Sequence, residues 1–222
     1  KIFSTNTNIV QKDLDVLSNW CDEWQMEVSP SKCENIDFHH SKKARSYHVD
    51  FFLDDTKIPK TVKIRDLGLF FSSDLSFSTH IDTVLRRSHQ RINIFFNILR
   101  HACFENYVKC YVIYIRPILE YASIVFSPVL KEHIKRLESV QKHFIYRVFR
   151  KFHIPYLSYF DALSLCKLTS LEYRRLISDL VFLYKIIVSK EIRSNFDFLS
   201  FPPLPNLRRH PFCFRSNIKN TD

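Results

Sequence analysis

The adjacent carboxylates Asp54 and Asp55 are the side chains in this 222-residue sequence whose spacing best suits metal chemistry. They lie between two short apolar segments, and neighbouring carboxylates in a tight loop could bind Mg²⁺, which prefers oxygen ligands. Aspartate is also a common turn residue, because its side chain hydrogen-bonds to nearby backbone. We therefore expect a solvated turn at these positions and no metal site in the chain.

Lys32 is the candidate for a catalytic role. It lies two residues after Pro30, which should end the first predicted helix. An ammonium group beside a leaving group can donate a proton and can stabilise the negative charge that grows in the transition state. A solvated loop lysine is the simpler interpretation of this residue by itself.

Gly68 is the only glycine of the chain and lies between two leucines in a segment that reads as a strand. Glycine weakens a strand unless another group approaches closely or a β-bulge forms. A binding site and a bulge without a ligand would both require the small residue. The lack of further glycines also excludes a Walker P-loop, a dinucleotide-binding loop and a nucleophile elbow.

The positive charge of the chain is concentrated in one region. The formal net charge is +10, and residues 77–190 contain 18 Lys and Arg against 8 Asp and Glu, whereas the rest of the chain is balanced. This concentration indicates a surface that faces a polyanion, and nucleic acid is the partner that it suggests. Lysines scattered over solvated helix faces are the alternative.

Two sets of basic residues have the helical spacing that is needed to follow a phosphate backbone. They lie off the apolar stripes of two predicted helices. The first set is Arg86, Arg87 and Arg91 in a helix predicted over residues 77–99. The second set is Lys131, Lys135 and Lys142, near one flank of a helix predicted over residues 131–149. We expect both sets to contact nucleic acid without reading its sequence, although any one of these residues could equally belong to a plain solvated face.

The residues before position 76 predict a small α+β segment. Apolar residues at intervals of three and four indicate a helix over residues 8–26, which Pro30 ends. Residues 33–39, 47–53 and 63–71 are short runs rich in Phe, Val and Ile that indicate strands, with the Asp54 turn between two of them.

The residues after position 76 predict helices over 77–99, 107–125, 131–149 and 169–188, and a short helix over 159–166. Pro117 should kink or break the second helix. The third helix should bury Ile134, Leu137, Val140, Phe144 and Val148. The last helix should bury Leu171, Leu176, Leu180, Leu183 and Ile187.

The cysteines form no Cys-x-x-Cys pair and favour reduced, structural thiols. They are Cys21, Cys33, Cys103, Cys110, Cys166 and Cys213. The longest apolar stretch, over about residues 111–130, is interrupted by Arg116, Pro117 and Glu120, so we expect no membrane span. No charged-then-apolar leader opens the chain, which predicts an intracellular protein, nuclear or cytoplasmic, that is not secreted.

Four blocks of the sequence resemble reverse transcriptases of non-LTR retrotransposons, in that family's order. They are DLDVLSNWCDEWQMEVSPSK at 13–32, RDLGLFFSSDLSFSTHI at 65–81, YIRPILEYA at 114–122 and LESVQK at 137–142. From the first block to the last, they extend over residues 13–142, which is more than half of the chain. The resemblance implies the end of a polymerase palm, the primer-grip strands and a helical thumb.

The resemblance also implies roles for single residues. The family's catalytic aspartates lie upstream of the first block, on a hairpin, whereas Asp54 and Asp55 lie between the first two blocks and do not match them. Lys1, Ile2 and Phe3 resemble the strand that leaves that hairpin. This chain would then be a fragment that is inactive by itself, and Mg²⁺ would be a cofactor of the complete polymerase alone.

By the same resemblance, Lys32 matches a lysine near the incoming triphosphate and would be a proton donor to pyrophosphate, and Gly68 would lie in the primer grip. We predict an α+β, mostly helical chain: residues 1–75 form the palm end and primer-grip strands, 76–190 the basic thumb and 191–222 an extended tail. Its predicted function is to bind an RNA template and DNA primer duplex as part of a reverse transcriptase. A stand-alone helical interaction module without nucleic acid is the alternative.

Overall fold

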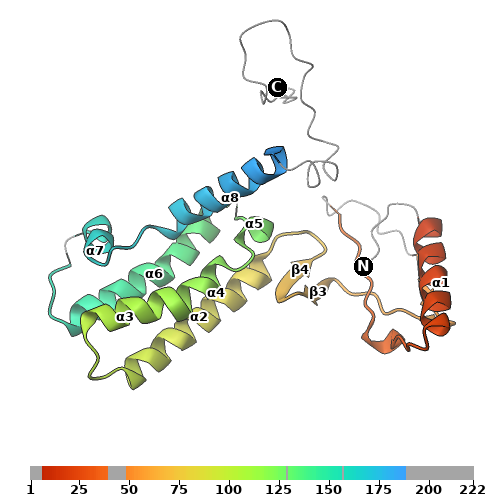
Figure 1. Ribbon diagram of the computed structural model, residues 1–222, viewed down its shortest axis with the longest axis horizontal. Coiled ribbons are helices and arrows are strands. Elements are labelled where there is room, and N and C mark those ends of the chain that lie inside the picture. Colours follow the sequence, from red (N-terminus) through yellow and green to blue (C-terminus); the bar gives the residue numbers. More distant parts are fainter. Residues whose placement is uncertain (1–6, 40–48, 129, 157, 189–222) are drawn as a thin grey trace, which may run out of the picture. The chain divides into compact units, whose positions relative to one another are not determined.

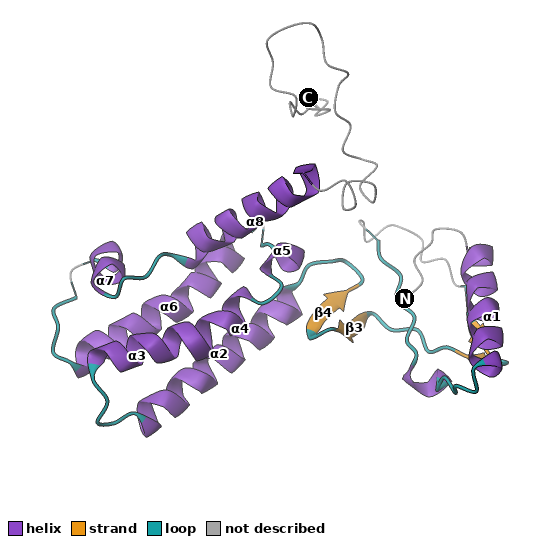
Figure 2. Cartoon of the chain, in the orientation of Figure 1, coloured by secondary structure: helices purple, strands orange, loops and turns teal. Residues whose placement is uncertain are grey.

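The computed structural model describes residues 7–39, 49–128, 130–156 and 158–188 (Figures 1 and 2). The predicted tail at 191–222 lies outside the described residues. The chain divides into two compact units, of which one ends at Ile94 and the other begins at Phe95. The architecture is α+β and mostly helical, which confirms the predicted fold class.

The first unit contains a helix packed on a small hairpin and a second hairpin further along the chain. Its elements are α1 (Thr7–Glu23), the 3₁₀ turn η1 (Pro30–Lys32), β1 (Phe52–Leu53), β2 (Thr56–Lys57), β3 (Lys63–Asp66), β4 (Leu69–Ser72) and most of α2 (Ser78–Ile98). Phe51, Leu53 and Ile58 are buried and pack against Val10 and Leu14 of α1. This core is small, and it relies on partly exposed aliphatic side chains.

Helix α1 ends earlier than the sequence predicts, at Glu23 instead of residue 26. Gln25 has a left-handed backbone with φ of 52°. The N–H of Gln25 donates to the carbonyl of Asp22 (3.2 Å), and that of Met26 donates to Cys21 (2.8 Å). These are the two bonds of a Schellman motif, which closes the helix before Pro30 is reached.

The strands are shorter than predicted. The predicted strand at 33–39 is wrong, because the segment forms one isolated bridge, between Asn35 and Lys60. The predicted strand at 63–71 is a hairpin instead, with β3 and β4 paired antiparallel across Leu67 and Gly68. Of the predicted strand at 47–53, only Phe52–Leu53 is a strand among the described residues.

The second unit is helical. It contains the end of α2, then α3 (Phe104–Cys110), the π-helical η2 (Tyr111–Ile115), α4 (Arg116–Glu120), α5 (Ser123–Phe126), α6 (Lys131–Lys151), α7 (Tyr159–Leu165) and α8 (Leu171–Val188). Helix α8 packs on α5 and α6, and α7 packs on α6 (Figure 1). Helix α6 agrees closely with its prediction, and its buried Leu137, Phe144 and Val148 are among the residues expected inside.

Of the kink or break predicted at Pro117, the break is wrong, because the helix continues through this proline to Glu120. Proline lacks an N–H, and its ring collides with the carbonyl four residues earlier. The chain avoids the collision with a wider π-helical turn before Pro117, in which the N–H of Arg116 donates to Tyr111, five residues earlier. The break comes at Ala122, whose φ is 54°.

Aromatic side chains form the core of the second unit. Tyr107, Tyr111, Phe126 and Phe144 are fully buried. The rings of Tyr111 and Phe144 stack with their centroids 4.7 Å apart, and Phe96 lies 6.0 Å from Phe144. Such contacts add to the free energy gained from burial alone.

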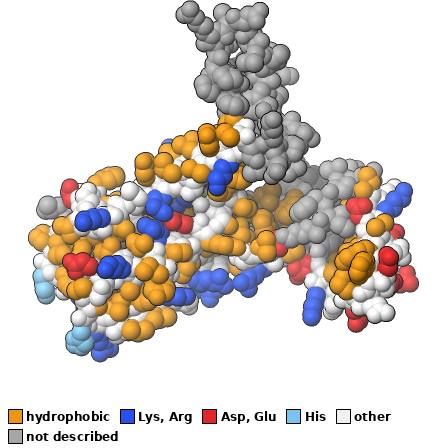
Figure 3. Space-filling view, in the orientation of Figure 1, with side chains coloured by type: hydrophobic (Ala, Val, Ile, Leu, Met, Phe, Trp, Pro, Cys, Tyr) orange, Lys and Arg blue, Asp and Glu red, His pale blue; other side chains and the backbone are white. Residues whose placement is uncertain are grey.

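The predicted inner face of α8 is wrong in part. Leu171 is buried as expected, but Leu176 and Leu180 are 54% and 52% exposed. The buried face of α8 instead carries Arg175 and Ile186. Hydrophobic side chains accordingly cover α8 on the face that Figure 3 shows.

Candidate nucleic-acid interface

The solvent face of α6 is a stripe of basic and polar side chains. Burial of Leu137, Phe144 and Val148 turns the opposite side of the helix outward. The exposed residues recur every three or four positions, as one helix face requires. This stripe, called here the α6 stripe, is Lys131, Lys135, Ser139, Lys142, Tyr146 and Arg150.

All three lysines predicted on this helix therefore lie along one exposed face. Neither Lys131 nor Lys135 forms an ion pair with a described residue, so both ammonium groups face solvent. Glu138, one of the two acidic residues of α6, is buried and does not face the stripe. The α6 stripe thus presents cations spaced along a helix to any external polyanion.

Aromatic rings hold several of the basic side chains of this unit. The ammonium of Lys142 lies 4.8 Å from the ring centroid of Tyr159, and the guanidinium of Arg147 lies 4.1 Å from that of Phe96. Lys151 lies 5.6 Å from the ring of Tyr107 and donates to the backbone carbonyl of Arg100 (2.8 Å). Cation–π contacts restrict the side chains without neutralising them.

A buried polar network fixes α6 relative to its neighbours. The hydroxyl of Tyr111 donates to Gln141 Oε1 (2.6 Å), and Gln141 Nε2 donates to Tyr159 Oη and to the carbonyl of Thr169 (2.9 Å each). Burial raises the pKa of both tyrosines, so both hydroxyls are neutral. The side chain of Gln141 is fully buried with all of these groups satisfied, so the network is structural.

Glu138 joins α6 to the start of α8. Its carboxylate accepts from the backbone N–H of Leu171 (3.2 Å) and of Glu172 (3.1 Å), and also from the hydroxyl of Tyr159. The first N–H groups of a helix lack partners within it, so this carboxylate caps α8. Burial lowers the pKa of the nearby Arg175 guanidinium, and the charge of Glu138 counteracts that effect.

A second polar contact joins the side of α8 to α4. Glu120, the last residue of α4, accepts from Nε of Arg174 and from its Nη2 (3.1 Å). The same carboxylate lies 3.8 Å from Nε of Arg116. These contacts orient α8 without using its apolar side chains.

The predicted arginines of α2 lie in the first unit. Arg86, Arg87 and Arg91 are exposed, and none forms an ion pair with a described residue. His80, on the same helix, is buried, and burial together with the charge of Arg87 lowers the pKa of its imidazole. The histidine is therefore neutral at pH 7, and the charge of this helix comes from the arginines.

Gly68 lies at the tip of the β3–β4 hairpin and not inside a strand. Its φ is 88°, and that of Leu67 is 46°. A two-residue hairpin loop with both φ values positive favours glycine at this position. The backbone of the turn itself thus requires Gly68, so the residue needs no ligand to explain it.

Lys32 is the last residue of η1, and its side chain is exposed.

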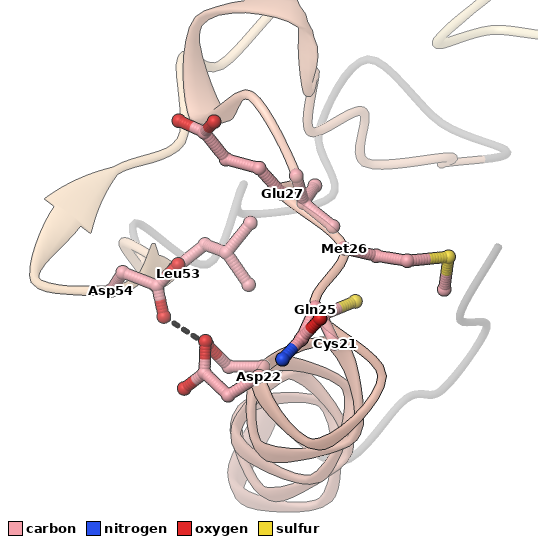
Figure 4. Close-up of a pocket in the computed structure, with 9 residues that line it drawn as sticks. Cys21, Asp22, Gln25, Met26, Glu27, Leu53 and Asp54 are labelled. Atoms are coloured by element: carbon pink, nitrogen blue, oxygen red, sulfur yellow. Dashed lines mark hydrogen bonds between the residues drawn. The ribbon is translucent and has the colours of Figure 1, made fainter.

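Asp54 and Asp55 form the tight turn between β1 and β2, with φ values of 50° and 59°, which confirms the predicted turn. Ser18 donates to Asp54 at the edge of a cavity of about 260 Å³, and Figure 4 shows Asp22 beside the same cavity.

The described residues contain no group of three or more His, Cys, Asp or Glu side chains that could hold a metal ion. Within the same residues, no helix is both long enough and apolar enough to cross a membrane.

Sequence reasoning missed basic and aromatic residues in the last part of α6 and just after it. These are Arg147, Arg150, Lys151, Tyr146 and Tyr156. The spacing of Tyr146 and Arg150 from Lys142, in steps of four residues, was a signal that could have found two of them. Nothing in the sequence placed Phe96 beside Arg147, because the two residues are far apart in the chain.

Two known proteins are similar to parts of this chain. Uncharacterized protein B0403.1 of Caenorhabditis elegans is 29% identical over 123 residues, which cover 54% of this chain and 62% of that protein. The RNA-directed DNA polymerase from mobile element jockey of Drosophila funebris is 21% identical over 145 residues, which cover 64% of this chain and 16% of the polymerase.

The chain thus spans less than two thirds of the length of either relative. No protein-family model matches it, and no solved structure matches it. The chain is distantly similar to a part of a non-LTR RNA-directed DNA polymerase.

Proposed function

We propose that this chain is the palm-end, primer-grip and thumb part of a non-LTR reverse transcriptase, and that its helical part binds the template–primer duplex. The α6 stripe is the observation that carries this proposal. Its lysines are exposed, spaced along one helix face and free of carboxylate partners among the described residues. Cations in such a row contact phosphates and carry no information about base sequence.

The buried network supports the same function because it holds α6 in place. Gln141 and Glu138 lie on the inner side of the helix that carries the stripe. Gln141 bonds to Tyr159 of α7, and Glu138 bonds to Tyr159 and to the start of α8. Side chains that bind a long polyanion must keep their spacing, and a rigid helix provides it. The polymerase similarity in turn supports nucleic acid as the polyanion.

The experiment measures the affinity of the chain for a primed RNA–DNA hybrid and for a DNA duplex at several salt concentrations. The logarithm of affinity should fall linearly with that of salt, by about 0.9 for each phosphate contact on B-form DNA. The variant K131A/K135A/K142A should bind more weakly and should lower the slope by about 2.7, if each lysine makes one contact.

A matched control removes the same charge elsewhere. Lys12, Lys57 and Lys109 are exposed and lie outside the α6 stripe. The variant K12A/K57A/K109A should keep both the affinity and most of the slope. Equal effects of the two triple variants would mean that only net charge matters, and the absence of any salt-dependent binding would favour the interaction-module alternative.

The exposed arginines of α2, in the first unit, are a separate proposed contact with nucleic acid. Replacing Arg86, Arg87 and Arg91 together by Glu should weaken binding to unrelated sequences and make the salt slope shallower, because phosphate contacts are lost. All three are exposed, so the free energy of unfolding should change little. A variant that binds like the parent would show that these arginines do not contact nucleic acid.

Lys32 has a proposed role only in a complete polymerase, as a proton donor to pyrophosphate. Its exposed ammonium lies on a short turn where a ligand can reach it. In a complete polymerase, Lys32→Arg should retain the charge but slow nucleotide addition, because arginine is not deprotonated at neutral pH. An unchanged rate would leave Lys32 as a solvated residue.

A further inference from the structure

Exposed aromatic rings gather where α6 ends and α7 begins. Tyr146 is 51% exposed, Tyr156 is 36% exposed and Phe160 is 74% exposed. Exposed apolar side chains that form one patch mark contact sites more often than single scattered ones do. The exposed rings and the cations beside them are called here the aromatic end of α6.

Each exposed ring of the aromatic end has another aromatic ring beside it. The centroids of Tyr146 and Tyr156 are 5.7 Å apart, with an interplanar angle of 74°. Phe160 lies 6.0 Å from Tyr159, over whose ring the ammonium of Lys142 is held. Tyr146 and Phe160 are both exposed, so a flat group can reach their rings from solvent.

Cations lie on both sides of these rings. Lys142 is one helical turn before Tyr146, and Arg150 is one turn after it. Asp161 is the acidic residue that follows Phe160, and its carboxylate is engaged with Ser158 at the start of α7. The aromatic end is therefore positively charged and ring-bearing, whereas the start of the α6 stripe, with Lys131 and Lys135, is positively charged without exposed rings.

The two ends of α6 suit different forms of nucleic acid. Paired bases are stacked inside a duplex and offer only phosphates to a side chain on the outside. Unpaired bases expose their faces, and proteins bind them by stacking on aromatic rings beside cations that hold the phosphates. The lysines at the start of the stripe suit a duplex, and the rings at its end suit unpaired nucleotides.

We infer that the aromatic end of α6 binds unpaired nucleotides next to the duplex, with bases stacked on Tyr146 and Phe160 and phosphates held by Arg150. This inference rests on the proposed function, because it adds a single-stranded segment to a duplex that the rest of the stripe binds. Stacking is tolerant of base identity, so the site takes any sequence.

The experiment compares two probes on the full chain, a blunt primer–template duplex and the same duplex with a short single-stranded template extension. The extension should strengthen binding roughly tenfold per stacked base. A fluorescent base analogue in the extension, 2-aminopurine, should lose emission on binding, because stacking quenches it. An extension without effect on affinity or emission would overturn the inference.

The variant Y146A/F160A should bind the two probes equally, with the salt slope on the blunt duplex unchanged, because the substitutions remove no phosphate contact. Tyr156 is left in place because its ring also contacts the buried Phe149. The matched control Y173A/Y184A removes two exposed rings from α8 and should keep the preference for the extension. Persistence of that preference in Y146A/F160A would overturn the inference.

The outcomes also separate this inference from the proposed function. A parent chain that binds the blunt duplex with the expected salt slope and ignores the extension supports the proposed function and overturns the inference. A parent chain that binds neither probe overturns both, and the rings would then suit a protein partner. The conservative variant Tyr146→Phe keeps a ring and should keep the preference.

Discussion

Helices α6 and α8 pack on each other but divide their residues between core and solvent in opposite ways. Helix α6 buries Leu137, Phe144 and Val148 and exposes lysines. Helix α8 buries Arg175 and exposes Leu176 and Leu180. An apolar stripe therefore determines the orientation of one helix and not of the other.

Polar contacts explain the orientation of α8. Its first N–H groups bond to the buried carboxylate of Glu138, and its Arg174 bonds to Glu120. Rotating α8 to bury Leu180 would break these bonds and leave the buried carboxylate of Glu138 without its two N–H donors, which is unfavourable for a buried charge. A helix with apolar residues on several faces is thus oriented by the polar groups that bond to its N-terminus and to Arg174.

The largest expected effect comes from removing the cap that α6 provides. Glu138→Ala leaves two N–H groups of α8 and the hydroxyl of Tyr159 without their acceptor, and it removes the carboxylate that balances Arg175. Each buried donor that is left without its acceptor costs about 1–3 kcal/mol, so losing the acceptor of three donors costs about 3 kcal/mol or more. We expect a loss of this size in the free energy of unfolding, measured by urea denaturation.

The control for the cap is Glu132→Ala, which removes an exposed carboxylate from the same helix. It should change stability by less than about 0.5 kcal/mol. Hydrogen exchange gives a local readout, because the amides of Leu171 and Glu172 should lose protection in Glu138→Ala. Protection at the parent level in both amides would contradict the cap.

The second effect separates the two faces of α8. Leu171 is fully buried and Leu180 is half exposed. Leu171→Ala should cost about 2–5 kcal/mol, because it leaves a cavity, whereas Leu180→Ala should change the free energy of unfolding by less than about 1 kcal/mol. Similar urea midpoints for the two variants would mean that the exposed face of α8 is covered in solution.

The third effect tests the hydroxyl that joins α7 to α6. Tyr159→Phe keeps the ring under Lys142 but removes the donor to Glu138 and the acceptor for Gln141. Leaving buried groups without a partner should cost about 1–3 kcal/mol in thermal or urea unfolding. Affinity for duplex should not change, because no cation of the α6 stripe moves. A variant as stable as the parent would show that water replaces the hydroxyl.

The sequence predicted α6 because its apolar residues follow a single stripe, which leaves one way to bury them. The same stripe identified Lys131, Lys135 and Lys142 as exposed. Helix α8 has apolar residues around most of its circumference, so periodicity alone gave no single inner face. Its orientation depends on Glu138, and a carboxylate 33 residues away in the chain has no local signal.

The two hairpin turns also show where prediction from local sequence succeeds and where it fails. The Asp54 turn could be predicted, because aspartate tolerates a left-handed backbone and bonds to it. The Leu67–Gly68 turn could not, because leucine rarely adopts a positive φ and the leucines around it read as a strand. The resemblance blocks contain Glu138, Gln141 and Gly68, but their structural roles follow only from the contacts that the fold provides.

The smallest effect concerns the turn that leads from α7 into α8. Lys167 has a φ of 52°, and the bonds from Lys167 to Ser164 (3.0 Å) and from Leu168 to Leu163 (2.9 Å) form a Schellman motif. This position favours glycine, because a Cβ strains the left-handed backbone. Lys167→Gly should therefore stabilise the chain by about 1 kcal/mol, measured as a higher urea midpoint.

Two variants separate backbone strain from the loss of a charge. Lys167→Ala removes the same ammonium but keeps a Cβ, so it should give no gain. Gly68→Ala is the reverse change, because it adds a Cβ at a φ of 88°, and it should destabilise the chain by about 1 kcal/mol. Equal urea midpoints for Lys167→Gly and Lys167→Ala would show that the left-handed backbone stores no strain at this turn.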